Sequence, residues 1–506
     1  MKRIILLLSG IMLSFTVTAQ DGESPVSYKS LAIQMSTLNS NGDASSAATT
    51  SVSTFNGYGS FLDNPASMAL SKMSFYSIGW LNQSNNQTNN YVGTQNETEF
   101  SNTNFGNLGL VYKVPTDRGS FVVGGGYNLI ANDSDETFLD AFNETNSITD
   151  LFKQSGSDYN GIAFEAFAVD FRNGTSNEIE SIFRVDGRPS GFQGINQFAE
   201  IARKRNIGEI SLFASTEFQK NLFAGVSLGI LSGSIHYDRS FQEVDVSNFY
   251  NDGVVPASGS DPATDIFSIT LNDEIDTDFY GFSARGGVIF KPIPFLNIGA
   301  SIAAPSKIFV TEIFYSNIRT EFDDNTFTDG DETTFSGEFE YAITKPAEFK
   351  VGASVEKIRN LTISASLEYI DYSSTKVDFT INTESLEPSD VAILKEDEQA
   401  TNQVISNTYN AVINFKANVG YSFSNHVKIV AGYALFPGKE NTYGFDEDVY
   451  SGSISFPIAE NISFDLSGQY STRNDRSIVY EFENTVQSIS NEKERLNILA
   501  GVKFRF

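Results

Sequence analysis

Apolar and polar side chains alternate along most of the chain after Phe75, which is the period of a β-sheet whose two faces meet different surroundings. The last segment shows this most clearly, because every second residue from Leu496 to Phe506 is apolar and Asn497 begins the more polar opposing set. The pattern predicts fourteen strands, at roughly residues 75–81, 104–114, 121–130, 207–219, 222–238, 277–291, 296–320, 333–356, 361–381, 404–423, 427–437, 447–457, 461–482 and 494–506.

The connections between these strands alternate between short turns and long loops. The long connections are predicted at 82–103, 131–206, 239–276, 321–332, 382–403, 438–446 and 483–493. This alternation and the even strand count are typical of a bacterial outer-membrane barrel with both termini on the periplasmic side. A β-sandwich gives no reason for it, and a water-soluble barrel of this size needs something to fill its lumen. The sequence therefore predicts an all-β fold, a 14-stranded antiparallel transmembrane β-barrel.

The chain before the first strand has a different character. Residues 1–19 have a basic start, a short apolar run and small residues up to Ala19, as a secretory signal peptide does. The apolar run is too short to favour the alternative, a membrane anchor. Residues 20–74 are rich in small and polar residues, and we expect them to form an N-terminal plug inside the lumen. Residues 75–506 then form the barrel, with 131–206 as its largest extracellular loop.

Composition narrows the function. The chain has 34 Lys and Arg against 63 Asp and Glu, a net charge of −29, which argues against nucleic-acid binding because Lys and Arg carry phosphate contacts. It has no cysteine and only two histidines, His236 and His426, for which the pattern implies no shared site. Acidic loops near Asp323 and Glu396 are interpreted as solvated surface, with a loose divalent-cation site near lipopolysaccharide as the alternative.

One motif resembles a catalytic one. Gly225–Gly229 matches G-x-S-x-G, but a nucleophile elbow needs a strand–turn–helix context, and this motif lies within a continuous alternating strand. We therefore expect no enzyme activity, no catalytic residues, no cofactor and no metal site.

Three segments carry a resemblance to a known family. They are Asp63–Ala69 with its Asn-Pro-Ala, Gly281–Lys307 with prolines between and after its strands, and Lys345–Tyr369 with a proline just before its first strand. In this order, and with this organisation, the chain resembles the FadL/TodX family of outer-membrane transporters for hydrophobic compounds. The resemblance implies passive uptake of a small hydrophobic molecule, a long-chain fatty acid or an aromatic hydrocarbon, by a monomer embedded in outer-membrane lipid and lipopolysaccharide. The alternatives are a structural or protein-secretion-accessory barrel and, less favoured, an enzyme embedded in a barrel.

The resemblance also implies where function lies: an extracellular apolar patch captures the ligand, a lumen pocket holds it, and a kink in the third strand releases it sideways. The plug motif is Asn64, Pro65 and Ala66, for which the alternative is an ordinary turn. The lateral gate is expected at Gly124, Gly125 and Gly126, for which the alternative is small residues that admit the plug. A helical turn is predicted over 198–204. The capture loop is Phe138, Leu139, Phe142, Leu151, Phe152, Phe164, Phe167, Phe192, Phe198 and Ile201, unless these residues pack the loop on itself.

Overall fold

The computed structural model of the chain describes residues 28–37, 42–48, 51–154, 157, 159–171, 179–183, 191–250, 264–330, 336–358, 360–384, 386–423, 427–442, 444–483 and 485–506. The predicted signal peptide, residues 1–19, and His426 lie outside these ranges. None of the described helices is long and apolar enough to span a lipid bilayer.

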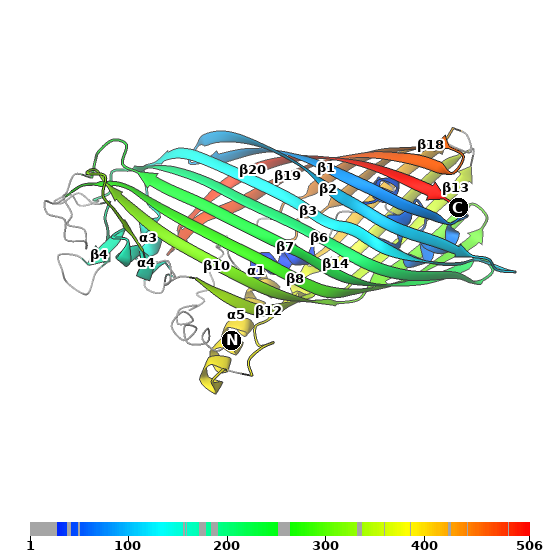
Figure 1. Cartoon of the computed structure of the whole chain (residues 1–506), viewed down its shortest axis with the longest axis horizontal. Coiled ribbons are helices and arrows are strands. Elements are labelled where there is room, and N and C mark those ends of the chain that lie inside the picture. Colours follow the sequence, from blue (N-terminus) through cyan, green and yellow to red (C-terminus); the bar gives the residue numbers. More distant parts are fainter. Residues whose placement is uncertain are drawn as a thin grey trace.

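The strands form one closed antiparallel barrel (Figure 1). Each wall strand pairs with the next along the chain, and β1 pairs with β20 to close the wall. The unbroken wall strands are β1 (Phe75–Tyr91), β2 (Thr94–Val114), β3 (Phe121–Asn143), β6 (Ile195–Gln219), β7 (Leu222–Val244), β8 (Ile266–Ile293), β16 (Ala411–Ser422), β17 (Lys428–Phe436), β18 (Glu447–Ala459), β19 (Ile462–Phe482) and β20 (Thr485–Arg505).

Three further wall strands are each broken into two pieces. They are β9 (Leu296–Ala303) with β10 (Ser306–Phe322), β12 (Ser336–Lys345) with β13 (Glu348–Ile358), and β14 (Leu361–Asp371) with β15 (Lys376–Asp378). Pro305 and Pro346 lie in the first two breaks, where a proline cannot donate to the ladder. Counted as wall strands, these give fourteen, so the predicted fold class is confirmed. A short extra strand, β11 (Phe327–Asp329), pairs with β10.

Several predicted boundaries were wrong. Residues 82–103 are not a loop, because β1 and β2 run on to a tight turn at Val92 and Gly93. The predicted 131–206 loop is shorter, because β3 reaches Asn143 and β6 begins at Ile195, and its predicted helical turn over 198–204 is part of β6. Residues 404–408 belong to a helix rather than to a strand. The missed strand ends are rich in Asn, Gln, Ser and Thr on both faces, so they show no apolar alternation to detect.

The outward face of the lower wall is apolar. Along β8, Tyr280, Phe282, Val288 and Phe290 all point outward and are about half exposed. The β20 face from Leu496 to Phe506 does the same. Aromatic side chains lie at both ends of these outward runs, as in the aromatic girdles of membrane barrels. Below its polar extensions, the wall therefore presents an apolar band with aromatic edges.

A plug fills part of the lumen. It consists of α1 (Tyr28–Ser36), α2 (Ala44–Ala47), η1 (Tyr58–Leu62) and η2 (Pro65–Leu70), which pack against the wall strands, and α1 is seen within the barrel in Figure 1. Polar side chains on the inner wall bond to plug carbonyl groups: Ser301 Oγ donates to Asp63 O at 2.6 Å and Ser120 Oγ to Ala69 O at 2.8 Å. Such bonds supply partners that the irregular plug backbone cannot find in itself.

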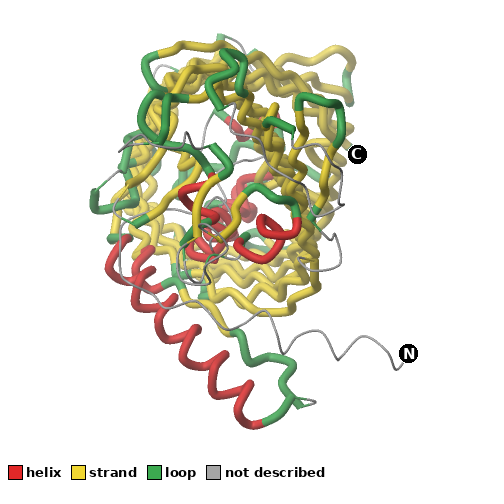
Figure 2. The backbone as a smooth tube through the Cα atoms, turned by 90° about the vertical axis from the view of Figure 1, so that its left-hand side faces the viewer, coloured by secondary structure: helices red, strands yellow, loops and turns green. Residues whose placement is uncertain are grey.

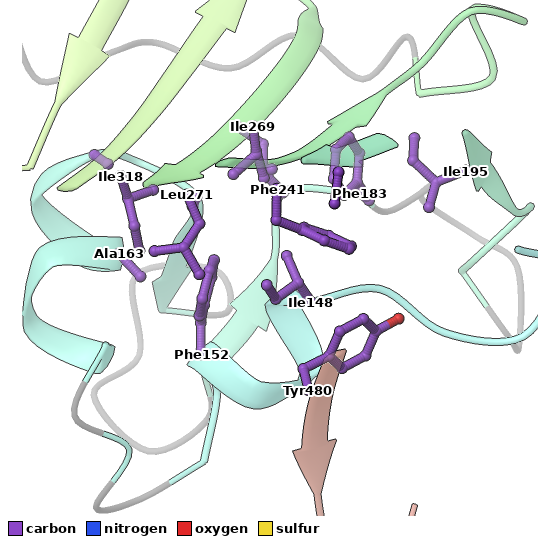
Figure 3. Close-up of a cluster of buried hydrophobic side chains, with 14 of the residues drawn as sticks. Ile148, Phe152, Ala163, Phe183, Ile195, Phe241, Ile269, Leu271, Ile318 and Tyr480 are labelled. Carbon is purple, nitrogen blue, oxygen red and sulfur yellow. The ribbon is translucent and has the colours of Figure 1, made fainter. Parts of the chain in front are cut away.

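A cap closes the end of the barrel that lies away from the C-terminus. It contains α3 (Thr149–Phe152), α4 (Asn160–Glu165), β4 (Val169–Phe171) and β5 (Ile179–Ser181), at the left of Figure 1. Phe152, Ile148 and Ala163 pack against Phe241 and Tyr480 of the wall in a continuous apolar cluster (Figure 3). Arg239 fastens the cap, since its guanidinium bonds Asp273, the Val479 carbonyl at 2.8 Å and the Tyr159 hydroxyl at 3.1 Å.

The wall is low on one side. β14, β16, β17 and β18 have 9–13 residues, whereas β1, β2, β3, β6, β7 and β8 have 17–28. Above the low side, η4 (Tyr372–Ser374) leads to α5 (Pro388–Thr408), which projects away from the barrel (Figures 1 and 2). Leu394 and Ile405 of α5 are buried, in the same apolar cluster as Ile33 and Met35 of α1.

Candidate ligand pocket

Two adjoining cavities of about 200 and 250 Å3 lie in the lumen between the plug, the wall strands β3, β6, β19 and β20, and the loop at 437–446. Ile33 and Gln34 of α1 line both cavities. Each cavity is smaller than the roughly 300–1,000 Å3 of a typical ligand site. With the plug in this position, the pocket suits a small ligand or one end of a longer one.

One wall of this pocket is strongly cationic. Arg203 and Arg205 of β6, Arg473 of β19, and Lys493 and Arg495 of β20 all point into it. Spacing by two residues puts the members of each pair on the same face of a strand. This concentration of cations contrasts with the net charge of −29 for the whole chain.

The carboxylates among these cations are shared. Asp135 lies 3.1 Å from Arg203 and 3.2 Å from Lys493, and Lys493 also lies 3.2 Å from Asp475. Asp133 accepts from Arg495 at 2.7 Å and also pairs with Arg205. Glu447 also lines both cavities, so the five Arg and Lys side chains face four carboxylates and keep a small excess of positive charge that an anion can use. Burial makes such pairing stronger than at a surface.

Lys439, from the 437–446 loop, adds a cation on the plug side. Its ammonium donates to the Thr37 hydroxyl at 2.8 Å and lies 5.2 Å from the centre of the Tyr372 ring. Burial, with a smaller contribution from Arg473, lowers the pKa of Lys439 to about 7. Its charge therefore changes near neutral pH.

The first cavity also has apolar lining. Ile33 of α1, Ala47 of α2 and, from the low wall, Tyr433, Phe436 and Val449 contribute to it, with Lys416 and Ser451 among them. A pocket with apolar and cationic lining is chemically suited to an amphiphile with a negative end. It is poorly suited to a hydrocarbon, which would leave the cations facing apolar atoms.

The sequence did not reveal these residues. Arg203-Lys204-Arg205 and Lys493-Glu494-Arg495 carry cations at i and i+2, a spacing that puts both on one face of a strand. The first set was predicted to be helical and the second was placed at the edge of a strand. If both segments had been recognised as strands, the sequence would have predicted that their cations point into the lumen.

Beside the pocket, the barrel wall has a seam. β2 and β3 form a backbone ladder only from Val114↔Phe121 up to Asn107↔Asn128. Above that point β2 continues with β1, β3 continues with β6, and the described residues of β2 and β3 share no further ladder. We call the overlap of 94–106 with 129–143 the seam.

Side chains join the two layers of the seam in place of backbone bonds. Gln83 of β1 donates to Asn132 O at 3.0 Å, Asn102 to Ser134 Oγ at 3.1 Å, and Thr98 to Glu136 O at 2.8 Å. The side-chain nitrogens of Asn96 and Asn104 are buried without a hydrogen-bond partner. An unpaired buried donor costs about 1–3 kcal/mol, so the seam is held less firmly than a continuous ladder.

The base of the seam is apolar and touches the plug. On the outside, Tyr127 stacks on Phe105 with ring centroids 5.7 Å apart. On the inside, Leu129 is fully buried in a cluster with Ala44 and Ala47 of the plug. The Leu129 carbonyl accepts from Gly42 N at 3.0 Å, so the plug satisfies the backbone group just above the last ladder pair.

The predicted gate glycines lie directly below the seam. Gly124, Gly125 and Gly126 are paired on one side with β2 and on the other with β6, so the wall is closed at these residues. Gly126 has φ +146°, a conformation that favours glycine, and a β-bulge follows between Leu129 and Ala131. The glycines thus mark where β3 departs from β2.

Most of the predicted capture loop packs into the cap. Leu139 and Phe152 are fully buried in its core, and Leu151, Phe164, Phe167, Phe192 and Ile201 pack against that core. Phe198 is half-buried on β6. Phe138 and Phe142 remain exposed, on the outer face of β3. For the buried members this is the packing that the sequence analysis gave as the alternative to ligand capture.

The plug motif lies against the wall. Asn64 is fully buried and caps η2, because its Oδ1 accepts from Ala66 N at 2.9 Å. Its Nδ2 donates to the plug carbonyl of Val52 at 2.7 Å and approaches the wall carbonyl of Val288 at 3.2 Å. Pro65 begins the helix, where a missing N–H costs nothing, and the Ser215 hydroxyl bonds the Pro65 carbonyl.

Comparisons with known proteins agree with this architecture. No family model matches the chain, and no curated protein matches it in sequence. Among solved structures, the P. putida toluene transporter TodX has 11% identity and a TM-score of 0.50, over 92% of this chain and 98% of that one. A Pseudomonas aeruginosa FadL homologue has 12% identity and a TM-score of 0.52, over 93% of this chain and 99% of that one. At this identity the comparisons show that the chain has the plugged fourteen-stranded fold of these outer-membrane proteins, as the resemblance implied.

Proposed function

We propose, from this shared fold and the pocket it encloses, that the protein is an outer-membrane channel for passive uptake of small amphiphiles with a negatively charged end. The observation that supports this most is the pocket itself, lined by the apolar Ile33 and Phe436 and by the cationic Arg203, Arg473 and Arg495. Medium- and long-chain fatty acids have this chemistry, whereas an aromatic hydrocarbon has no group for the cationic wall.

The route of release follows from the seam. A ligand that leaves the pocket past Ala47 and Leu129 meets Tyr127 and Phe105 at the upper edge of the apolar band. Separation of the two seam layers breaks side-chain bonds rather than a backbone ladder, and Gly126 can absorb the change in strand direction. The ligand then enters the outer leaflet sideways, with both chain termini on the periplasmic side.

In this conformation the cap obstructs a straight path from the extracellular end, because Phe152 and Phe241 are fully buried in its core. The second cavity is instead lined by the 437–446 loop above the low wall, including Pro437 and Phe445. We place entry at this loop. Phe138 and Phe142 lie on the outer face of β3, within the seam, and do not line either cavity.

The test is uptake of labelled decanoate by Gram-negative cells that lack their own fatty-acid channel. Because the chain has no cysteine, Asn102→Cys with Ser134→Cys allows the seam to be locked by a short bifunctional maleimide. Asn90→Cys with Gln95→Cys, a cross-strand pair at the β1–β2 tip, is the matched control. Locking the seam should abolish uptake while locking the tip leaves it unchanged. Equal uptake after both treatments would refute lateral release.

A second pair of variants tests the pocket separately. Arg495→Gln should reduce decanoate uptake at least tenfold, whereas Arg118→Gln, at an exposed position in the β2–β3 turn, should not. A barrel with a structural or secretion-accessory role would give no decanoate uptake above the empty cell in any variant.

A further inference from the structure

A cluster of potential metal ligands lies outside the barrel, away from the pocket. His236 of β7 and Asp276 of β8 are direct cross-strand partners, and Glu274 lies two residues from Asp276 on the same face. One ligand atom from each of these three side chains lies within 4.8 Å of the other two. On the outer surface, the His236 side chain is 38% exposed and the Asp276 side chain 59% exposed.

The cluster lies above the apolar band. Along β7 the outward apolar run ends at Ile230, and along β8 it begins at Tyr280. The outward positions beyond these residues are polar, which places the cluster on the water side of the upper aromatic edge. At this height β7 is hydrogen-bonded to β6 and β8, and β8 is hydrogen-bonded to β7 and β10. The ligand-bearing backbone is thus rigid, and binding an ion would require little reorganisation.

The charges around His236 are unbalanced. Asp238 lies directly opposite Glu274 in the ladder, and like charges in that position are destabilising. Asp278 continues the same acidic face. Among the described residues, none of Asp238, Glu274 and Asp278 takes part in an ion pair. The nearest cation on the neighbouring strand β6 is Lys204, opposite His236, and its ammonium lies 5.9 Å from the centre of the Phe100 ring. A bound dication would offset this repulsion.

The donor set indicates the metal. An imidazole nitrogen with two or three carboxylate oxygens suits Zn2+, which accepts mixed nitrogen and oxygen ligands, better than Ca2+ or Mg2+, which prefer oxygen alone. We propose that His236, Glu274 and Asp276, with Asp238 beside them, bind one zinc ion on the extracellular outer face of the barrel. Three protein ligands leave a fourth position open to water or to a phosphate oxygen.

The test is a titration of the purified, chelator-treated barrel with Zn2+ near pH 7.5. The background is low, because the chain has no cysteine and only one other histidine. We expect one high-affinity equivalent, and at least a tenfold loss of affinity in both His236→Ala and Glu274→Gln. Asp324→Asn, in the acidic turn after β10, is the control and should titrate like wild type.

Cobalt gives a second readout that depends on ligand identity. Co2+ bound at this site should show visible absorption that His236→Ala abolishes, while heat-modifiable migration on a gel confirms that the variant barrel is folded. Zinc binding that His236→Ala leaves unchanged would overturn the proposal. So would Mg2+ binding as tight as Zn2+ binding, which would indicate a general acidic surface.

Discussion

Asn64 holds the plug in place, and its removal should unseat the plug without harming the barrel. In Asn64→Ala, the Ala66 N–H loses its cap and the Val52 carbonyl loses its 2.7 Å donor, both in a fully buried setting. Loss of an N-cap costs about 0.5–2 kcal/mol and an unsatisfied buried group about 1–3 kcal/mol. Since these two costs overlap, we take the destabilisation of the seated plug in Asn64→Ala as about 2–3 kcal/mol.

We take the plug motif to lose these internal bonds together with the Val288 contact when it leaves the wall, so that this free energy sets the open population. At 1.4 kcal/mol for each factor of ten, it raises the fraction of molecules with an unseated plug by about 30- to 150-fold. Single-channel recording in planar bilayers measures that fraction as the open probability. Asn90→Ala, which removes an exposed amide at the tip of β1, is the control and should behave like wild type.

The outcome is informative in both directions. Gly287→Ala should have a similar effect, because a Cβ there would lie 1.9 Å from Asn64 Oδ1, whereas Gly286→Ala meets nothing within 4 Å. If the open probability of Asn64→Ala equalled that of Asn90→Ala while both barrels were folded, Asn64 would not be an anchor of the plug.

Three further predictions concern the pocket, the cap and the seam. The pKa of Lys439 is about 7 in the folded protein and 10.5 as a free side chain, so the stability of its loop rises with pH between these two values. Because Lys439 loses its positive charge as the pH rises through 7, decanoate affinity should fall between pH 6 and 8. Calorimetry should show a smaller fall in Lys439→Met. Arg239→Ala leaves Asp273 buried without its cation and should destabilise the cap by about 3–5 kcal/mol. Proteolysis of the cap on intact cells should then be faster. Arg319→Ala breaks an exposed ion pair worth about 0–1 kcal/mol and should leave the proteolysis rate unchanged. Gly126→Ala forces φ +146° on alanine and puts its Cβ 2.0 Å from Leu108 O. The free energy of unfolding in urea should therefore fall by at least about 1 kcal/mol. A stability equal to that of Gly286→Ala would refute a strained backbone at Gly126.

The sequence determined the parts of the fold in which one face of a strand meets lipid. The half-exposed faces of β8 and β20 alternate cleanly with polar inner positions, so their strands, their number and the closed barrel could be predicted. The upper halves of β1, β2 and β3 could not, because water or protein lies on both sides and Asn, Gln and Ser suit either face. For the same reason, 82–103 was wrongly predicted as a loop.

The site was harder to predict than the fold. The contact of Asn64 with the wall carbonyl of Val288 is of a kind that the residue type permits, because an Asn side chain can bond backbone groups. The cationic wall was not, because Arg203 and Arg495 come from strands far apart in the chain and meet only when β6 and β20 curve around one lumen. For Leu139 and Phe152 the sequence left two interpretations open, because an apolar cluster in a loop can form a ligand surface or a core. The structure buries both side chains completely in the cap.

Equilibrium binding of a matched ligand pair to the barrel in lipid nanodiscs tests the central claim most directly. Decanoate and decanol have the same chain length and differ at the end that would face Arg203, Arg473 and Arg495. The amphipathic pocket predicts that decanoate binds at one site, that decanol binds at least tenfold more weakly, and that Arg495→Gln removes the difference. Equal affinity for acid and alcohol in the wild-type protein would contradict a pocket that recognises a negative charge.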